Sequence, residues 1–211
     1  GLGFDFRLAM GIPDFWIKTI KEVEDQNWQV GDIFYRLTDK RADEQVISYV
    51  ESHDQALVGD KTVIFRLIDS EMYYSMCVDQ QNIVVDRGMA LHKMLRLITL
   101  TTSQGGYLNF MGNEFGHPEW IDFPRKGNHW SYHYARRQWS LSEDVKLKYR
   151  FLMAFDQAMI QHVANTNAFE YAPVPLVRNQ HDQVLAFQRG DFLFVFNFNP
   201  TQSFESYGIE G

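Results

Sequence analysis

The sequence is poor in the features of secreted proteins. Cys77 is its single cysteine, and it has no Asn-x-Ser/Thr glycosylation site. One cysteine cannot form a disulfide within the chain, and a chain without disulfides or glycosylation sites gives no indication of an oxidising compartment. We therefore expect a cytoplasmic protein.

Basic charge is also scarce. The 211 residues include 20 Lys and Arg against 27 Asp and Glu, for a formal net charge of −7. Nucleic acids and anionic membrane surfaces bind clustered Lys and Arg, so neither is an expected partner, and a neutral ligand fits better. The sequence has no apolar run of membrane-spanning length and no leader, and it begins with Gly1, which predicts a fragment of a longer protein.

Aromatic residues, by contrast, are abundant. The chain has 17 Phe, 10 Tyr and 5 Trp, and 45% of its residues are hydrophobic. Such a composition predicts a folded core and also supplies rings on which sugars can stack. We expect the core to use most of them.

Hydrophobic periodicity predicts alternating strands and helices over the first two thirds of the chain. Strands are expected at residues 3–8, 45–50 and 107–111, and helices from Pro13, over residues 62–77, and from Asp86 as N-cap to Thr101. Residues 28–41 are ambiguous between a short helix and a loop. This order is typical of α/β proteins with parallel strands.

The last third changes character. A capping-box pattern at Ser140–Glu143 predicts a helix reaching His162, which would bury Leu147, Phe151, Phe155 and Met159. Residues 172–175 then predict a linker. Two strands, 184–188 and 192–198, flank Arg189-Gly190-Asp191 and predict a hairpin that begins an all-β domain.

Polar side chains follow two of the predicted strands. Glu51-Ser52-His53-Asp54 comes after the second strand, and Gly112-Asn113-Glu114-Phe115-Gly116 after the third. Parallel strands gather functional side chains at their carboxyl ends, and this density of polar groups favours a site. The alternative is a structural turn in which Ser52 or Asp54 caps the next helix and His53 is half-buried.

Both segments resemble one enzyme family. The stretches ESHDQALVGDKT and MGNEFGHPEW, with GFDFRLAMGIPDFW, DRGMALHKMLRLIT, SYHYARRQW and FNFNP, resemble the 1,4-α-glucan branching enzymes of the α-amylase superfamily over essentially the whole chain. The resemblance implies a (β/α)8 TIM barrel followed by an all-β sandwich. Residues 1–168 would form the C-terminal part of the barrel, about strands six to eight, and residues 169–211 the start of the sandwich.

The resemblance also implies an activity and its residues. These enzymes cleave an α-1,4-linked glucan and transfer the chain to a 6-hydroxyl, with retention, in glycogen or starch biosynthesis. Asp54 matches the transition-state stabiliser, and His53, Glu114 and Trp120 match substrate-binding positions. The nucleophile and the acid/base have no counterpart in this chain, so we expect it to be inactive alone.

A third carboxylate in such a site acts electrostatically, because nucleophile and acid already fill the two roles of a retaining mechanism. The implied partner is an α-1,4-glucan polysaccharide. No cofactor and no metal are expected, and a monomer is expected. An amylase-type glycoside hydrolase and a non-catalytic glucan-binding fragment remain alternatives.

Other residues have supporting or weaker roles. Glu51 and Asp60 are expected to be hydrogen-bonding struts for the first segment, and Arg136-Arg137 to form a structural ion pair. His129 and His133 lack a nearby carboxylate, which disfavours a metal site. Five aromatic residues could stack on sugars or hold a long loop, and the sequence leaves this open: Trp120, Trp130, Tyr132, Tyr134 and Trp139.

Overall fold

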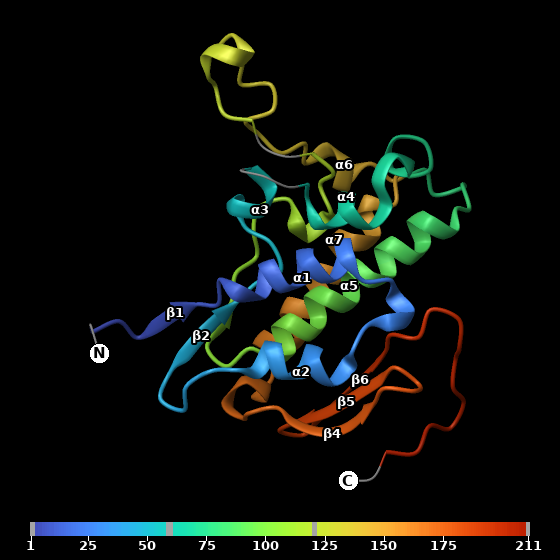
Figure 1. The fold of residues 1–211 in the computed structure, drawn as a ribbon. Coiled ribbons are helices and arrows are strands. Elements are labelled where there is room, and N and C mark those ends of the chain that lie inside the picture. The colour runs from blue at the N-terminus through green and yellow to red at the C-terminus, as the bar shows by residue number, and fades with distance from the viewer. Residues whose placement is uncertain (1–2, 58–60, 120–121, 210–211) are drawn as a thin grey trace. The chain divides into compact units, whose positions relative to one another are not determined.

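The computed structural model describes residues 3–57, 61–119 and 122–209 (Figure 1). The chain divides into two compact units. The first comprises Gly1–Ser48, Leu97–Leu108 and Gln161–Gly211, and the second comprises Tyr49–Arg96 and Asn109–Ile160. This division differs from the boundary expected after residue 168, which stays a prediction.

The first unit contains a parallel sheet of β1 (Phe6–Leu8), β2 (Gln45–Ser48) and β3 (Gly106–Tyr107), in that order. The three strands were expected, but the prediction that the third reaches Met111 was wrong. Leu108 donates the last sheet hydrogen bond, to Ser48 O at 3.0 Å, and the Phe110 carbonyl instead accepts the Asn113 N–H in a turn. β1 is likewise shorter than predicted.

Helices α1 (Gly11–Glu22) and α2 (Val30–Thr38), with the short 3-10 helix η1 (Asp25–Asn27), belong to the same unit. Their amphipathic faces form its core. Trp16 and Trp28 are fully buried with ring centroids 6.4 Å apart, and Trp16 Nε1 donates to Thr99 Oγ1 at 2.9 Å. The ambiguous stretch at 28–41 is therefore mainly helical.

An antiparallel sheet of β4 (Val174–Asn179), β5 (Val184–Arg189) and β6 (Phe192–Asn197) completes the first unit, after η5 (Ala168–Glu170). The predicted hairpin is confirmed, and Gly190 supplies the positive φ of +59° at its turn. The linker prediction was wrong at its end, because Val174 already pairs with Gln188.

The second unit is mostly helical. Its elements within Tyr49–Arg96 and Asn109–Ile160 are α3 (His53–Leu57), α4 (Val63–Ile68), η2 (Asp69–Tyr73), η3 (Asn113–Phe115), η4 (Lys126–Asn128) and α6 (Ser140–Glu143). Ile64, Leu95, Phe115 and Leu152 are fully buried and form its core. The helix predicted over 62–77 is divided at Asp69, which has a φ of 55°.

Helices α5 (Ile83–Thr102) and α7 (Tyr149–Ala164) contribute residues to both units. The prediction of Asp86 as N-cap was wrong: Asn82 Oδ1 accepts the N–H groups of Val84 and Val85, at 2.9 and 3.2 Å. Among the helices in the described ranges, none is long and apolar enough to cross a membrane.

The capping-box prediction was also wrong. Ser140–Glu143 forms the separate helix α6 without a side-chain cap, and α7 begins only at Tyr149. The predicted inward stripe is confirmed at Met159 but wrong at Phe151, which is 43% exposed while its neighbour Leu152 is buried.

Candidate active site

The first predicted segment begins at the carboxyl end of β2 and enters α3 at His53 (Figure 1). Ser52 performs the capping: its Oγ accepts the Asp54 N–H at 3.2 Å, and its own N–H donates to Gln55 Oε1 at 3.0 Å. The side chains of His53 and Asp54 are 64% and 50% exposed, and His53 Nε2 lies 3.1 Å from Asp54 Oδ1. This pair presents an imidazole and a carboxylate at the surface of the second unit.

Glu51 holds the start of that segment through a buried hydrogen bond. Its carboxyl group is buried, with 2% of the residue exposed, and accepts the backbone N–H of Val63, the first residue of α4. Burial raises the pKa of the Glu51 carboxyl to about 7, opposed by this hydrogen bond, by the charges of Arg137 and Arg96, and by a hydrogen bond from Asn113. The strut predicted at Glu51 is confirmed, whereas Asp60 lies outside the described residues.

Two glycines shape the second predicted segment. Gly112 and Gly116 flank η3 with φ values of +93° and +70°. A Cβ on Gly112 would lie 2.7 Å from Arg137 Nε, and one on Gly116 would lie 2.7 Å from Leu152 Cδ1. Both the left-handed backbone and the close packing require glycine at these positions.

Arg137 holds this segment in place. Its buried guanidinium donates to the carbonyl oxygens of Met111 and Glu119, at 2.8 and 2.6 Å, and its Nη1 lies 3.2 Å from His117 Nδ1. The structural role predicted for Arg136-Arg137 is confirmed at Arg137. Arg137 hydrogen-bonds mainly to backbone carbonyl oxygens and not, as expected, to a carboxylate.

The two predicted segments meet within the second unit. Asn113 hydrogen-bonds to Glu51, and Thr62 Oγ1 donates to the Pro118 carbonyl at 3.1 Å. The first contact joins Glu51, two residues before His53, to Asn113, directly before Glu114. The second joins Thr62, directly before α4, to Pro118, four residues after Glu114. The two polar segments that the sequence singled out are therefore in contact.

Glu114 is half-buried in this arrangement. Its buried Oε2 has no hydrogen-bond partner among residues 3–57, 61–119 and 122–209. Burial raises the pKa of its carboxyl, and the negative charge of Asp156 raises it further, whereas Arg96 lowers it. Substrate binding by Glu114 stays a prediction.

A buried charge cluster lies beside Glu114. Arg96 forms an ion pair with Asp156, with side chains only 1% and 11% exposed. Asn109 bridges the pair, accepting from Arg96 Nη2 at 2.8 Å and donating to Asp156 at 2.9 Å. Arg96 Nη1 also donates to the Glu114 carbonyl at 3.4 Å, so the cluster supports the backbone of the second segment.

Trp120, predicted to bind substrate, lies outside the described residues. Four other loop aromatics are described, and they are between 43% and 75% exposed: Trp130, Tyr132, Tyr134 and Trp139. Trp139 also packs on Phe115 with centroids 5.2 Å apart. Their exposure is compatible with sugar stacking, and the choice between stacking and holding the loop stays open.

No group of three or more His, Cys, Asp or Glu side chains in the described part of the chain is arranged to hold a metal ion. His129 and Trp130 both have positive φ, at 54° and 58°, in the turn after η4. His129 therefore occupies a turn rather than the helical face that an i, i+4 metal pair with His133 would need.

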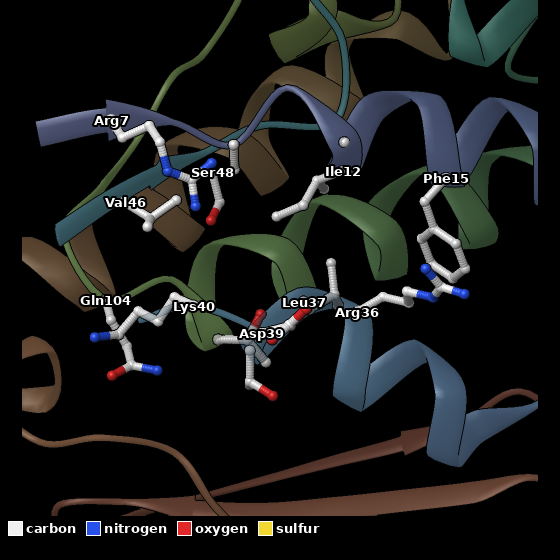
Figure 2. A pocket seen from close by; sticks show the side chains of 14 residues that line it. Arg7, Ile12, Phe15, Arg36, Leu37, Asp39, Lys40, Val46, Ser48 and Gln104 are labelled. Carbon is white, nitrogen blue, oxygen red and sulfur yellow. The ribbon is translucent and has the colours of Figure 1, made fainter. Parts of the chain in front are cut away.

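A cavity of about 270 Å³ occurs in the first unit (Figure 2). Arg7 and Val46 of the parallel sheet, Ile12 and Phe15 of α1, and Lys40 after α2 contribute to its wall. Its lining residues all belong to the first unit, and they do not include His53, Asp54 or Glu114.

Sequence reasoning did not identify Asn113, His117 or Thr62 as supports of the site. Burial lowers the pKa of the His117 imidazole to about 4, and the Arg137 charge lowers it further. The only sequence signal was their position, since each lies within or directly after a motif that had already been recognised.

The C-terminal antiparallel sheet lies in a part of the chain that matches a known family of domains. Residues 176–210 match the family model described as the alpha amylase, C-terminal all-beta domain. These residues include β5, β6 and most of β4. The all-β character predicted for this part of the chain is confirmed.

Curated relatives align with nearly the whole chain. Proteins named 1,4-alpha-glucan-branching enzyme are 54% identical in Debaryomyces hansenii, 52% in Rhizophagus irregularis and 53% in Yarrowia lipolytica, each over 99% of this chain. The chain spans 30%, 31% and 30% of their respective lengths. Over almost all of its length, this chain is therefore a homologue of the 1,4-alpha-glucan-branching enzymes.

Proposed function

We propose that the intact protein forms α-1,6 branches in an α-1,4-glucan, glycogen or starch, and that this chain contributes part of its active site. The observation that carries the proposal is identity above half of the aligned residues with proteins named 1,4-alpha-glucan-branching enzyme, over 99% of the chain. That alignment includes both polar segments. The exposed His53–Asp54 pair on an anchored segment supports it independently.

The proposed reaction is a double displacement with retention. A carboxylate supplied elsewhere in the intact protein attacks C1 of the glucan while a carboxylic acid protonates the departing 4-oxygen. The 6-hydroxyl of another glucan then attacks C1, gives its proton to the same acid/base, and releases the nucleophile. Interception by the hydroxyl, in place of water, makes the reaction a transfer.

Asp54 is proposed to act on the positive charge that develops at the sugar ring while one bond to C1 breaks and the other forms. Its carboxylate would accept hydrogen bonds from sugar hydroxyls and stabilise the oxocarbenium-like transition state more than the ground state. His53, with Nε2 3.1 Å from Asp54 Oδ1, would orient the carboxylate, and its other ring nitrogen would hydrogen-bond to a neighbouring hydroxyl. Both side chains are exposed enough to reach a polymeric substrate.

The proposed setting is a (β/α)8 barrel to which β1, β2 and β3 belong. Within the described residues β1 pairs only with β2, and the apolar side chains of Phe6 and Leu8 are 49% and 46% exposed. A neighbouring parallel strand would satisfy the unpaired backbone edge and bury these side chains. Because the chain spans less than a third of these relatives, other parts of the protein can supply such a strand.

The test is linkage analysis of the product made by the intact protein from linear α-1,4-glucan. The proposal predicts new α-1,6 linkages without a matching rise in reducing ends, because each cleaved bond is replaced. A rise in reducing ends without α-1,6 linkages would instead identify a hydrolase of the amylase type. The 211-residue chain alone is expected to give neither product, and turnover by it would contradict the assigned division of catalytic groups.

A further inference from the structure

A buried hydrogen bond joins Glu51 and Val63, which lie on either side of the His53–Asp54 pair in the sequence. Glu51 lies just before this pair and Val63 lies beyond α3, and the Glu51 carboxyl group accepts the Val63 N–H. Between them, the side chains of His53 and Asp54 are largely exposed and pair with each other. Their position therefore depends on how firmly the two ends of the segment are held.

The same carboxyl group also reaches the second motif. The Asn113 side chain donates a hydrogen bond to Glu51, and Asn113 lies 3.4 Å from His92 Nε2 through its Nδ2. Glu51 thus accepts from two N–H donors at the starts of two different helices, α4 and η3. A carboxylate can satisfy both with its two oxygens, whereas a protonated carboxyl turns one oxygen into a donor that faces donors.

The surrounding charges also respond to the charge of Glu51. Arg137 and Arg96 face it from the loop after η4 and from α5, and Asp156 on α7 neutralises much of Arg96. Glu114 and Glu51 both act on Arg137, whose pKa burial lowers. His117 is held neutral beside Arg137, so it adds no charge near neutral pH.

We propose that Glu51 is a positioning residue for Asp54, and that its carboxyl group holds the catalytic segment by accepting hydrogen bonds from Val63 and Asn113 together. This inference rests on the proposed branching activity. A displacement of the Asp54 segment of about 1 Å would suffice to lower the rate by roughly a hundredfold.

Glu51→Gln in the intact protein tests this directly. Glutamine keeps the size of the side chain and one acceptor oxygen but replaces the other oxygen with an NH2 donor, so it cannot accept from both Val63 and Asn113. We expect kcat for branching at pH 8 to fall by at least about tenfold, with KM changed by less than about twofold. Glu143→Gln, at an exposed carboxylate of α6, is the matched control and should keep the wild-type kcat and KM.

Amide hydrogen exchange supplies a second readout that does not need activity. In the intact protein at pH 8, the Val63 amide and residues 52–57 should exchange at least about tenfold faster in Glu51→Gln than in wild type. Unchanged exchange, or a wild-type kcat of Glu51→Gln in an active protein, would overturn the inference. Absence of branching by wild type would instead contradict the proposed function, and the exchange result would still decide the role of Glu51.

Discussion

Arg137 donates a hydrogen bond to Nδ1 of His117, with 3.2 Å between Nη1 and Nδ1. A guanidinium has no acceptor, so this contact requires the neutral tautomer with its proton on Nε2, whereas the Glu119 carbonyl oxygen, 3.1 Å from Nδ1, would accept from the other tautomer. His117 is 3% exposed, and Nε2 has no partner within the described ranges. This contact ties the stability of the second motif to a histidine that stays neutral when buried.

The lowered pKa of His117 should make the folded protein less stable in mild acid. The unfolded chain binds a proton at this histidine below pH 6.5, but the folded protein does so only below about 4. The free energy of unfolding therefore falls as the pH is lowered from 6.5 to 4, by up to ~3 kcal/mol from this group. His117→Asn, which keeps an acceptor for Arg137, should remove that part of the decrease in denaturant titrations. His129→Asn at an exposed turn should not, and identical pH slopes for both variants would refute the argument.

The raised pKa of Glu51 should make the free energy of unfolding depend on pH in the opposite direction. Its pKa rises from 4.5 to about 7 on folding, so the folded protein retains a proton that the unfolded chain loses. Stability from this group is present below pH 4.5 and is lost as the pH rises through 7, by ~3 kcal/mol. In denaturant titrations, Glu51→Gln should therefore become more stable relative to wild type between pH 5 and pH 8. A difference that is constant across this range would contradict the assignment.

The Arg96–Asp156 ion pair should be essential to the second unit. Asp156→Asn leaves the Arg96 guanidinium buried without its counterion, which we expect to cost roughly 3–5 kcal/mol of unfolding free energy. The exposed pair of Arg36 with Asp32 in α2 provides the comparison, and Asp32→Asn should cost less than ~1 kcal/mol. Equal losses in urea denaturation would show that the burial of Arg96 has little energetic consequence.

Gly116 should not tolerate a side chain. Alanine there would have a φ of +70° and a Cβ 2.7 Å from Leu152 Cδ1, and we expect a destabilisation of roughly 2–4 kcal/mol. Gly31→Ala in α2 is the control, since its Cβ would meet nothing within 4 Å, and it should stabilise by about 0.5–1 kcal/mol. Melting temperatures that move in the same direction for both variants would contradict this account.

Local signals in the sequence were sufficient for several elements. Alternating and β-branched residues located β2, and the turn at Gly190 located the β5–β6 hairpin, because each pattern depends on neighbouring residues. Boundaries set by distant contacts were mispredicted. Asn109 leaves the strand pattern to bridge Arg96 and Asp156, and Asn82 rather than Asp86 caps α5.

The candidate site follows the same rule. Its exposed members, His53 and Asp54, could be named from a contiguous motif. The neutral state of His117 and the raised pKa of Glu51 could not, because each depends first on burial, and the Arg137 charge from elsewhere in the sequence adds to the shift at His117 and opposes the shift at Glu51. A sequence pattern names a segment, but only the fold shows which residues hold it.

Asp54 is proposed to stabilise the transition state of glucan branching, and this role is measured by branch formation with Asp54→Asn in the intact protein. Asparagine keeps the shape but removes the charge, so we expect the rate of α-1,6 linkage formation to fall by roughly a hundredfold or more, with an unchanged melting temperature. The exposed Asp43→Asn should branch at the wild-type rate. Near-normal branching by Asp54→Asn would contradict the role assigned to this carboxylate.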